Sequence, residues 1–379
     1  MTLRRLKSLV VAVFSLSILF FSNVSVAQGH HDTATHQEEG ANDHVEGQTS
    51  EKNFDAAEVI LEHIKDGHEF HFATVGESHV TIPLPIIIYS PERGFSSFMS
   101  SKFHHGHEAY NGYKLEHGKI IAVDARGNHD ESVTVYDLSL TRNVVQMIIA
   151  LALLVWLMTS IAKRYAKGQG VRTAPSGIQN AIEPVITFVR DEVAKPNLGK
   201  KWEKYLPYLL TVFFFILINN LFGLLPGSAN VTGNIAFTLV LGVISFIVIL
   251  ISTNGHYWGH IVWPPVPMFV KIILIPVEIL SVFTKPFALI VRLFANMVAG
   301  HIIILSFISL IFIFGTMNKG IGWGFSPVSI LFTVFIYFIE ILVAFIQAFI
   351  FTNLTAVFVG QAFEGGHDDV DGHEDAVII

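Results

Sequence analysis

Ionisable side chains interrupt a strongly apolar stretch at residues 269–315. Four of them stand seven residues apart from one to the next: Lys271, Glu278, Lys285 and Arg292. Seven residues on a 3.6-residue helix return to nearly the same face, with a drift of about 20°. The four side chains are therefore expected to form one stripe that faces protein or water. Snorkelling to the membrane surface is an alternative explanation for Lys271 and Glu278.

Arg292 needs a different explanation, because it lies 23 residues inside the apolar stretch. Arginine keeps its positive charge at any accessible pH. A permanent charge at that depth is typical of a counter-ion, a voltage sensor or an ion-translocation site. Voltage sensors repeat their arginines, whereas this stretch contains a single one. The pattern favours a counter-ion or a translocation site.

A second long apolar stretch, nearer the C-terminus, carries Glu340 and Gln347, which are also seven residues apart. In two antiparallel neighbouring helices, residues at the same level have a constant sum of residue numbers. Arg292 with Gln347 gives 639, and His301 with Glu340 gives 641. Both sums predict a turn near residue 320, where turn-forming residues occupy 318–322. A single hairpin thus predicts Arg292 beside Gln347 and His301 beside Glu340.

His301 is expected to act apart from the arginine stripe. It follows Arg292 by nine residues, which is about 13.5 Å along a helix and roughly half a turn around it. A histidine and a carboxylate can exchange a proton near neutral pH, because histidine titrates there and each group shifts the pKa of the other. The alternative is a structural ion pair between packed helices. Intramembrane His and Glu chains usually mark proton paths, which favours the relay.

Membrane-spanning helices must position these side chains. Only 15% of the residues are charged, against about a quarter in soluble domains, and none lies between Lys204 and Lys271. The predicted spans are 143–162, 205–225, 234–252, 269–315 and 328–363. The last two far exceed the roughly 20 residues of a perpendicular crossing, so they must tilt, bend or break. We predict an all-α polytopic membrane protein with five transmembrane helices and a long tilted C-terminal helical hairpin.

The N-terminus has the features of a signal peptide. Residues 1–27 contain a basic start, a short apolar segment and a small-residue cleavage site; an uncleaved anchor helix is the alternative. Basic residues gather between positions 163 and 204, which places that loop in the cytoplasm by the positive-inside rule. The two signals agree on a multi-pass protein of the inner (plasma) membrane. Its N-terminus is extracytoplasmic, and its acidic tail at 364–379 is cytoplasmic.

The polar parts of the chain predict further segments. Residues 28–53 are His- and acid-rich, a composition typical of disorder. Residues 54–140 alternate β-branched runs with turn formers, which predicts a small, mostly β extracytoplasmic domain before a transmembrane domain at 141–363. A short helix is expected at 54–65, and an amphipathic helix on the membrane surface, or an ordinary linker helix, at 177–193. The predicted strands are 80–82, 85–89, 119–123 and 132–136.

Composition excludes several kinds of site. The chain has no cysteine, so disulfides, thiolate catalysis and Cys-ligated metals are ruled out. A net charge of −7 without a basic stripe argues against a nucleic-acid partner. Clustered histidines can ligate zinc, copper or nickel, so His104, His105 and His107 are weak metal candidates. The alternative for them is a solvated, disordered stretch.

Three segments resemble subunit a of F-type ATP synthases. Residues 287–301, FALIVRLFANMVAGH, are similar to the signature helix of that family. Residues 340–352, EILVAFIQAFIFT, resemble its last helix, and residues 220–226, NLFGLLP, resemble the end of its second span. The resemblance covers about residues 140–363 in order and spacing. Gly223 departs from it, since some relatives are acidic there, and Ala295 stands where many bacterial members have glycine.

The resemblance implies a proton-translocating stator subunit with two half-channels, which is non-catalytic on its own and needs no cofactor. Its expected partners are a rotating ring of c subunits, peripheral-stalk b subunits, membrane lipids and, indirectly, the catalytic head. Arg292 matches the essential arginine that faces the ring carboxylates, and His301 and Glu340 match a half-channel pair that is reversed in some relatives. Asn296 and Gln347 match the polar neighbours of that arginine. Asn220, in the 220–226 segment, is a further candidate for proton translocation, and Glu278 and Lys285 of the stripe are expected to be supporting membrane charges.

The alternative function is an ion-coupled secondary transporter or channel that uses the same buried Arg, His and Glu side chains. Such folds usually show paired repeats and helices broken at the midplane of the membrane. The sequence shows no internal repeat and an odd number of predicted spans. Both observations favour the stator over the transporter.

Overall fold

The computed structural model describes residues 66–75, 78–106, 108–116, 118–124, 126–170, 173–225, 227–253 and 266–364. The predicted signal peptide, the segment 28–53, the helix at 54–65, His107 and almost all of the acidic tail lie outside these residues. The described chain divides into two compact units. One combines residues 66–68 and 85–139 with 300–337; the other combines 69–84, 140–299 and 338–364.

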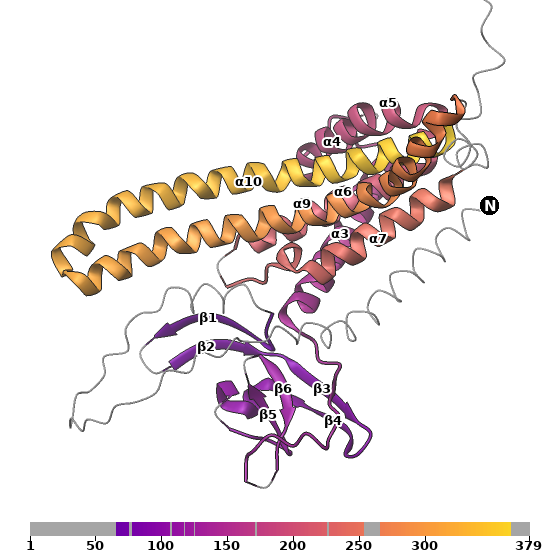
Figure 1. Ribbon diagram of the computed structural model, residues 1–379. Helices are drawn as coiled ribbons and strands as arrows, with labels where there is room; N and C mark the ends of the chain where they lie inside the picture. The colour runs from indigo at the N-terminus through magenta and orange to yellow at the C-terminus, as the bar shows by residue number, and fades with distance from the viewer. Residues whose placement is uncertain are drawn as a thin grey trace, which may run out of the picture. The chain divides into compact units, whose positions relative to one another are not determined.

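Helices make up most of the residues that the structure describes (Figure 1). They are α3 (Arg142–Ala166), α4 (Ile178–Phe188), α5 (Lys195–Leu198), α6 (Trp202–Gly223), α7 (Ile235–Ser252), α9 (Met268–Met317) and α10 (Lys319–Glu364), with a π-helical turn, η2 (Val189–Ala194), between α4 and α5. Within the described residues, five helical stretches are long and apolar enough to cross a membrane. The prediction of five spans is therefore confirmed at the level of length and composition.

Helices α9 and α10 form the predicted antiparallel hairpin (Figure 1). In one unit, Phe307 stacks on Phe332 with ring centroids 5.5 Å apart, and Phe314 meets Phe325 at 4.8 Å. The residue numbers of each pair add up to 639, the sum predicted for Arg292 with Gln347. In the other unit, Lys285 of α9 lies over the ring of α10 residue Phe358 at 5.1 Å. The two helices are thus antiparallel neighbours in both units.

The hairpin turn is tighter than predicted. Residues 318–322 were expected to form the turn and the last helix to begin near 328, whereas α10 already begins at Lys319. Glycines and a proline in this segment are poor helix formers, but tertiary packing compensates for them. A Cβ at Gly322 would lie 2.7 Å from the Cα of Gly315. The close approach of the two helices therefore requires that both residues lack a side chain. The Ser329 hydroxyl also donates to the Phe307 carbonyl.

Short antiparallel strands make up the N-terminal part. β1 (Glu69–Val75) pairs with β2 (Ser78–Pro83), and β5 (Tyr113–Glu116) pairs with β6 (Lys119–Ala122). A three-stranded sheet has the order β4-β3-β7, with β4 at Gly94–Met99, β3 at Pro85–Ser90 and β7 at Tyr136–Asp137. Three of the four predicted strands are present at nearly the predicted positions, and the fourth, at 132–136, overlaps β7 only at Tyr136. The strands β1, β4 and β5 were not predicted.

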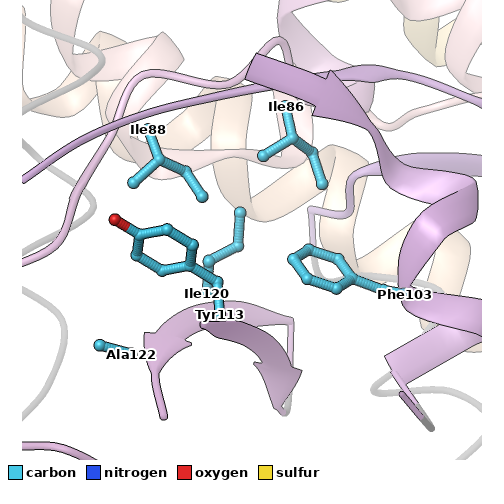
Figure 2. Packing of buried hydrophobic residues seen from close by; sticks show 6 residues of the cluster. All are labelled: Ile86, Ile88, Phe103, Tyr113, Ile120 and Ala122. Atoms are coloured by element: carbon cyan, nitrogen blue, oxygen red, sulfur yellow. The ribbon is translucent and has the colours of Figure 1, made fainter. Parts of the chain in front are cut away.

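A small apolar core lies under the three-stranded sheet (Figure 2). Ile86 and Ile88 point inward from β3, as the strand alternation requires. They meet Phe103 from the 3₁₀ helix η1 (Ser100–Gly106) and Tyr113 from β5. Ile120 and Ala122 of β6 complete the cluster (Figure 2). Packing against this core stabilises short strands whose sequences show only a weak strand pattern.

His68, just before β1, and Asp137, in β7, form a buried side-chain contact that we call the clasp. The His68 Nε2 lies 2.9 Å from the Asp137 Oδ2, and the histidine is 5% exposed. Burial by itself raises the pKa of the Asp137 carboxyl group. Its hydrogen bonds with the His68 ring and with the hydroxyl and amide of Ser139 have a larger effect in the opposite direction, so the pKa lies below its ordinary value. The clasp connects the residue before β1 to the strand that leads into α3.

We expect this clasp to make the stability of the unit depend on pH. A carboxylate whose pKa is lowered in the folded state stabilises that state above the unfolded pKa of 3.8, and the contribution is lost as the pH falls through the lower folded value. Asp137→Ala should cost about 1–3 kcal/mol at pH 7, since it leaves the buried His68 Nε2 without its partner, and should flatten the pH dependence below about pH 4. Hydrogen-exchange protection factors of β3 and β7 measure both effects.

Glu131→Gln is the matched control for that measurement, because Glu131 is exposed in the same unit. Its protection factors should follow those of the unmodified chain at every pH. Equal protection in Asp137→Ala and Glu131→Gln would contradict a stabilising role for the clasp.

Candidate functional site

Arg292 lies on an exposed face of α9. An adjacent side of the helix is buried against the rest of its unit, through Leu289, Leu293 and Met297. Arg292 makes no hydrogen bond and no ion pair with any residue that the structure describes. Its guanidinium is therefore available to a partner from outside the described chain.

Alanines flank Arg292 on the same exposed face. Ala288, Ala295 and Ala299 are all exposed, and their positions four before, three after and seven after Arg292 place them on one side of a helix. Small residues let another helix approach the backbone closely. The arginine thus projects from a surface that is shaped for close helix packing.

The predicted neighbours on α10 lie on its buried face. Gln347 is 5% exposed and Glu340 is 6% exposed, while Ala344 between them is fully buried. Gln347 and Arg292 belong to the same unit, but no hydrogen bond joins them within the described residues. Their side-by-side placement is supported by the hairpin register.

Asn220 connects α6 to α10 by a hydrogen bond at the level of Ala344. Its Nδ2 donates to the carbonyl of Ala344 at 3.2 Å, and the residue is fully buried. Its Oδ1 is buried and has no hydrogen-bond partner among the described residues. Buried amide oxygens are usually satisfied by protein or ordered water. The free Oδ1 of Asn220 is therefore a suitable site for a water molecule close to α10.

Glu340 and His301 carry the chemistry that was predicted for a proton relay. The Glu340 Oε2 is buried without a hydrogen-bond partner among the described residues. His301 is half-buried on α9 and interacts with a neighbouring group. Asn296, also half-buried, precedes Met297 on the same helix. The pairing of His301 with Glu340 stays a prediction.

The remaining charges of the stripe lie nearer the start of α9. The Lys285 Nζ is 3.3 Å from the Gln361 Oε1 and lies over the ring of Phe358. It therefore fastens the first half of α9 to the end of α10. Glu278, the preceding member of the stripe, is half-buried.

Two buried polar residues near the site were missed from the sequence. The Gln146 side chain, on α3, donates to the Ala229 carbonyl at 2.6 Å and accepts from the Ala229 amide at 2.8 Å. The next residue, Asn230, donates to the Met297 carbonyl of α9 at 3.4 Å. The loop before α7 is thus fastened to both α3 and α9. In the sequence, Gln146 could have been recognised as a functional or structural residue because it is a single glutamine within an apolar span.

Within the described part of the chain, which leaves out His107, no group of three possible metal ligands comes together. His104 is exposed, and its Nε2 lies 3.7 Å from the Glu108 carboxylate. His105 stands in η1. The role of the three histidines in metal binding stays a prediction.

Comparisons with known proteins identify two matching families. Residues 144–360, more than half of the chain, match the family described as ATP synthase A chain. Residues 59–138 match a family described as a domain of unknown function (DUF8433). The N-terminal strands and the helical part therefore match two separate families.

Several relatives match about two thirds of the chain or more. ATP synthase subunit a of Chloroherpeton thalassium is 46% identical over 245 residues, which cover 63% of this chain and 71% of the relative. The protein of the same name from Chlorobium phaeobacteroides is 40% identical over 293 residues, 71% of this chain and 83% of the relative. That of Anaeromyxobacter dehalogenans is 37% identical over 285 residues, 70% of this chain and 71% of the relative. The chain belongs to the ATP synthase subunit a family.

Proposed function

We propose that this chain is the proton-translocating stator of the ATP synthase membrane sector, with two half-channels that are separated at Arg292. The observation that carries the proposal is the exposed Arg292 on the alanine-flanked face of α9. In this role the chain is a non-catalytic subunit of a larger complex. Its surface supplies a fixed positive charge to the carboxylates of a rotating ring of c subunits.

The charge requirement follows from the bilayer. A deprotonated carboxylate cannot face lipid at acceptable cost, and it is tolerated only where water or a positive charge meets it. Because Arg292 stays protonated, it favours release of the proton from each arriving carboxylate and blocks direct proton flow between the half-channels. Each proton moving through 100 mV supplies about 2.3 kcal/mol, so the ring must accumulate several to drive one ATP.

The other site residues supply the aqueous paths in this proposal. Glu340 and His301 form the proton relay of one half-channel, and the unpaired Oδ1 of Asn220 holds water beside α10. Asn296 and Gln347 are the polar neighbours of Arg292. Glu278 and Lys285 support the part of α9 nearer its N-terminus.

The same proposal assigns the topology and the partners. Lys163 and Arg164 in the last turn of α3, with the basic loop that follows, lie on the cytoplasmic side of the inner membrane. In the proposed topology, residues 54–140 lie outside the cytoplasm after a signal peptide at 1–27, the transmembrane domain at 141–363 lies in the bilayer, and the tail at 364–379 lies in the cytoplasm. Peripheral-stalk b subunits hold the chain against the catalytic head.

Cross-linking tests whether the alanine face meets the ring. The chain has no cysteine, so Ala295→Cys and Ala299→Cys each introduce a single thiol. In the intact complex, both should form disulfides with a cysteine placed beside the ring carboxylate. Phe283→Cys is the control, since Phe283 is exposed but lies nine residues before Arg292, on the other side of the helix. Equal cross-linking from all three positions, or none from the two alanines, would contradict the proposal.

A further inference from the structure

One face of the three-stranded sheet is apolar and exposed. Strand alternation turns Ile86 and Ile88 of β3 into the core (Figure 2) and turns Tyr89 outward. Tyr89 pairs with Phe95 of β4 on one side and with Tyr136 of β7 on the other. The rings of Tyr89 and Tyr136 stack with centroids 6.3 Å apart. An aromatic row therefore crosses all three strands on the side away from the core.

Further apolar residues extend the row into a continuous surface, which we call the aromatic face. Its members are 43% to 67% exposed: Tyr89, Phe95, Met99, Tyr136 and Leu138. Large apolar patches on a protein surface usually mark a binding site for protein or membrane. Asp137, the acidic residue between two members of the face, is turned to the other side and held by His68. The aromatic face thus carries no carboxylate of its own.

The chain connection limits where this face lies. Leu138 precedes Arg142, the first residue of the apolar helix α3, by four residues. Four extended residues span at most about 14 Å. The chain connection therefore keeps Leu138 within that distance of the first residue of α3, a helix that is long and apolar enough to cross a membrane.

The chemistry of the face suits that surface. Tyrosine and tryptophan are enriched at membrane–water interfaces, where the ring lies among the acyl chains and the polar group remains in the headgroup region. Tyr89 and Tyr136 provide phenol groups, while Phe95, Met99 and Leu138 provide purely apolar contact. Binding to a soluble partner protein would not require the face to precede a membrane span by so few residues.

We propose that the aromatic face rests in the lipid headgroup region of the leaflet where α3 begins, so that the N-terminal β-structure is a membrane-surface module. The proposal depends on α3 spanning the membrane and is independent of the proton-translocating role. It assigns an interaction to the part of the chain that matches a family of unknown function.

Ser97 offers a position for a test that leaves the face intact. It is exposed on β4 between Phe95 and Met99 and pairs with Ile87, an outward residue of β3. In the cysteine-free chain, Ser97→Cys can carry a single nitroxide label. The full-length protein is reconstituted into vesicles of phosphatidylethanolamine and phosphatidylglycerol. Collision of the label with oxygen, which concentrates in lipid, is compared with collision with a water-soluble nickel chelate.

The label at Ser97 should show a severalfold higher ratio of oxygen to nickel collisions than a label at Lys119→Cys. Lys119 is the matched control, because it is exposed on β6 of the same unit and lies off the aromatic face. Adding Tyr89→Ser and Phe95→Ser to Ser97→Cys should lower the ratio to that of the control. Since both side chains point away from the core, this variant is expected to fold.

Two results would overturn the proposal. A ratio at Ser97 equal to that at Lys119 would show that the face lies in water. Low collision with both reagents would show that protein covers the face, either residues of this chain outside the described ranges or another subunit. In both cases the proton-translocating role would be unaffected, since its tests depend on α9 and α10.

Discussion

Replacing Arg292 with alanine is expected to lower proton-driven ATP synthesis by about a hundredfold or more. Without the guanidinium, a deprotonated ring carboxylate meets no fixed positive charge at this surface. Burying one charge at the centre of a membrane helix costs about 2.5–3.5 kcal/mol on insertion scales, and each 1.36 kcal/mol in a barrier changes a rate tenfold. Synthesis by the purified complex in proteoliposomes, driven by an imposed proton gradient and potential, measures the loss.

The same substitution should also allow protons to leak through the membrane sector. Arg292 separates the half-channels electrostatically, so its removal opens a direct path while the ring stands still. A pH-sensitive dye trapped in vesicles detects that leak in the absence of nucleotide. Val291→Ala is the control, because Val291 is an exposed apolar neighbour on α9, and it should retain both synthesis and a tight membrane. Synthesis at the unmodified rate in Arg292→Ala would falsify the proposed mechanism.

Replacing Glu340 with glutamine is expected to slow proton flow by about 10²- to 10⁴-fold, the usual contribution of a positioned acid–base group. Glutamine keeps the size of the side chain and its capacity for hydrogen bonding but cannot carry a proton in this range of pH. ATP-driven proton uptake by vesicles measures the effect. Glu340→Asp is expected to restore part of the rate, because it returns a titratable carboxylate to the same buried position.

A paired exchange separates a relay from a structural ion pair. If His301 and Glu340 work together, each single change, His301→Glu or Glu340→His, should lose most of the activity. The double variant should recover part of it, since the same two groups are again present. The amount of assembled complex, measured by its content of this chain, should be unchanged in Glu340→Gln. A normal rate in Glu340→Gln, or a fall explained fully by lost assembly, would contradict the relay.

The sequence was sufficient for the hairpin and its register. Positions seven residues apart return to one helix face regardless of context, so the charged stripe of α9 and the pair on α10 could be placed on single faces. Antiparallel packing then requires a constant sum of residue numbers, and the stacked Phe307 and Phe332 satisfy the predicted sum of 639. These features depend on local periodicity and on a single short connection.

The sequence was not sufficient where distant segments decide the structure. β4, with the sequence GFSSFM, lacks the β-branched pattern of a strand and forms because β3 supplies its hydrogen-bonding partner. The start of α10 at Lys319 depends on Gly322 packing against Gly315. Local propensity is a weak predictor when tertiary contacts compensate for it.

The sequence by itself determined the five apolar stretches, the polar stripe and the residue types that can hold or transfer a proton. Only the tertiary structure decided that Arg292 is exposed on a face of alanines while Glu340 and Gln347 are buried. It also decided that Gln146 and Asn220 bind backbone groups 83 and 124 residues away. The physical reason is that helical periodicity is local, whereas the side of a helix that is covered depends on which distant segments pack against it.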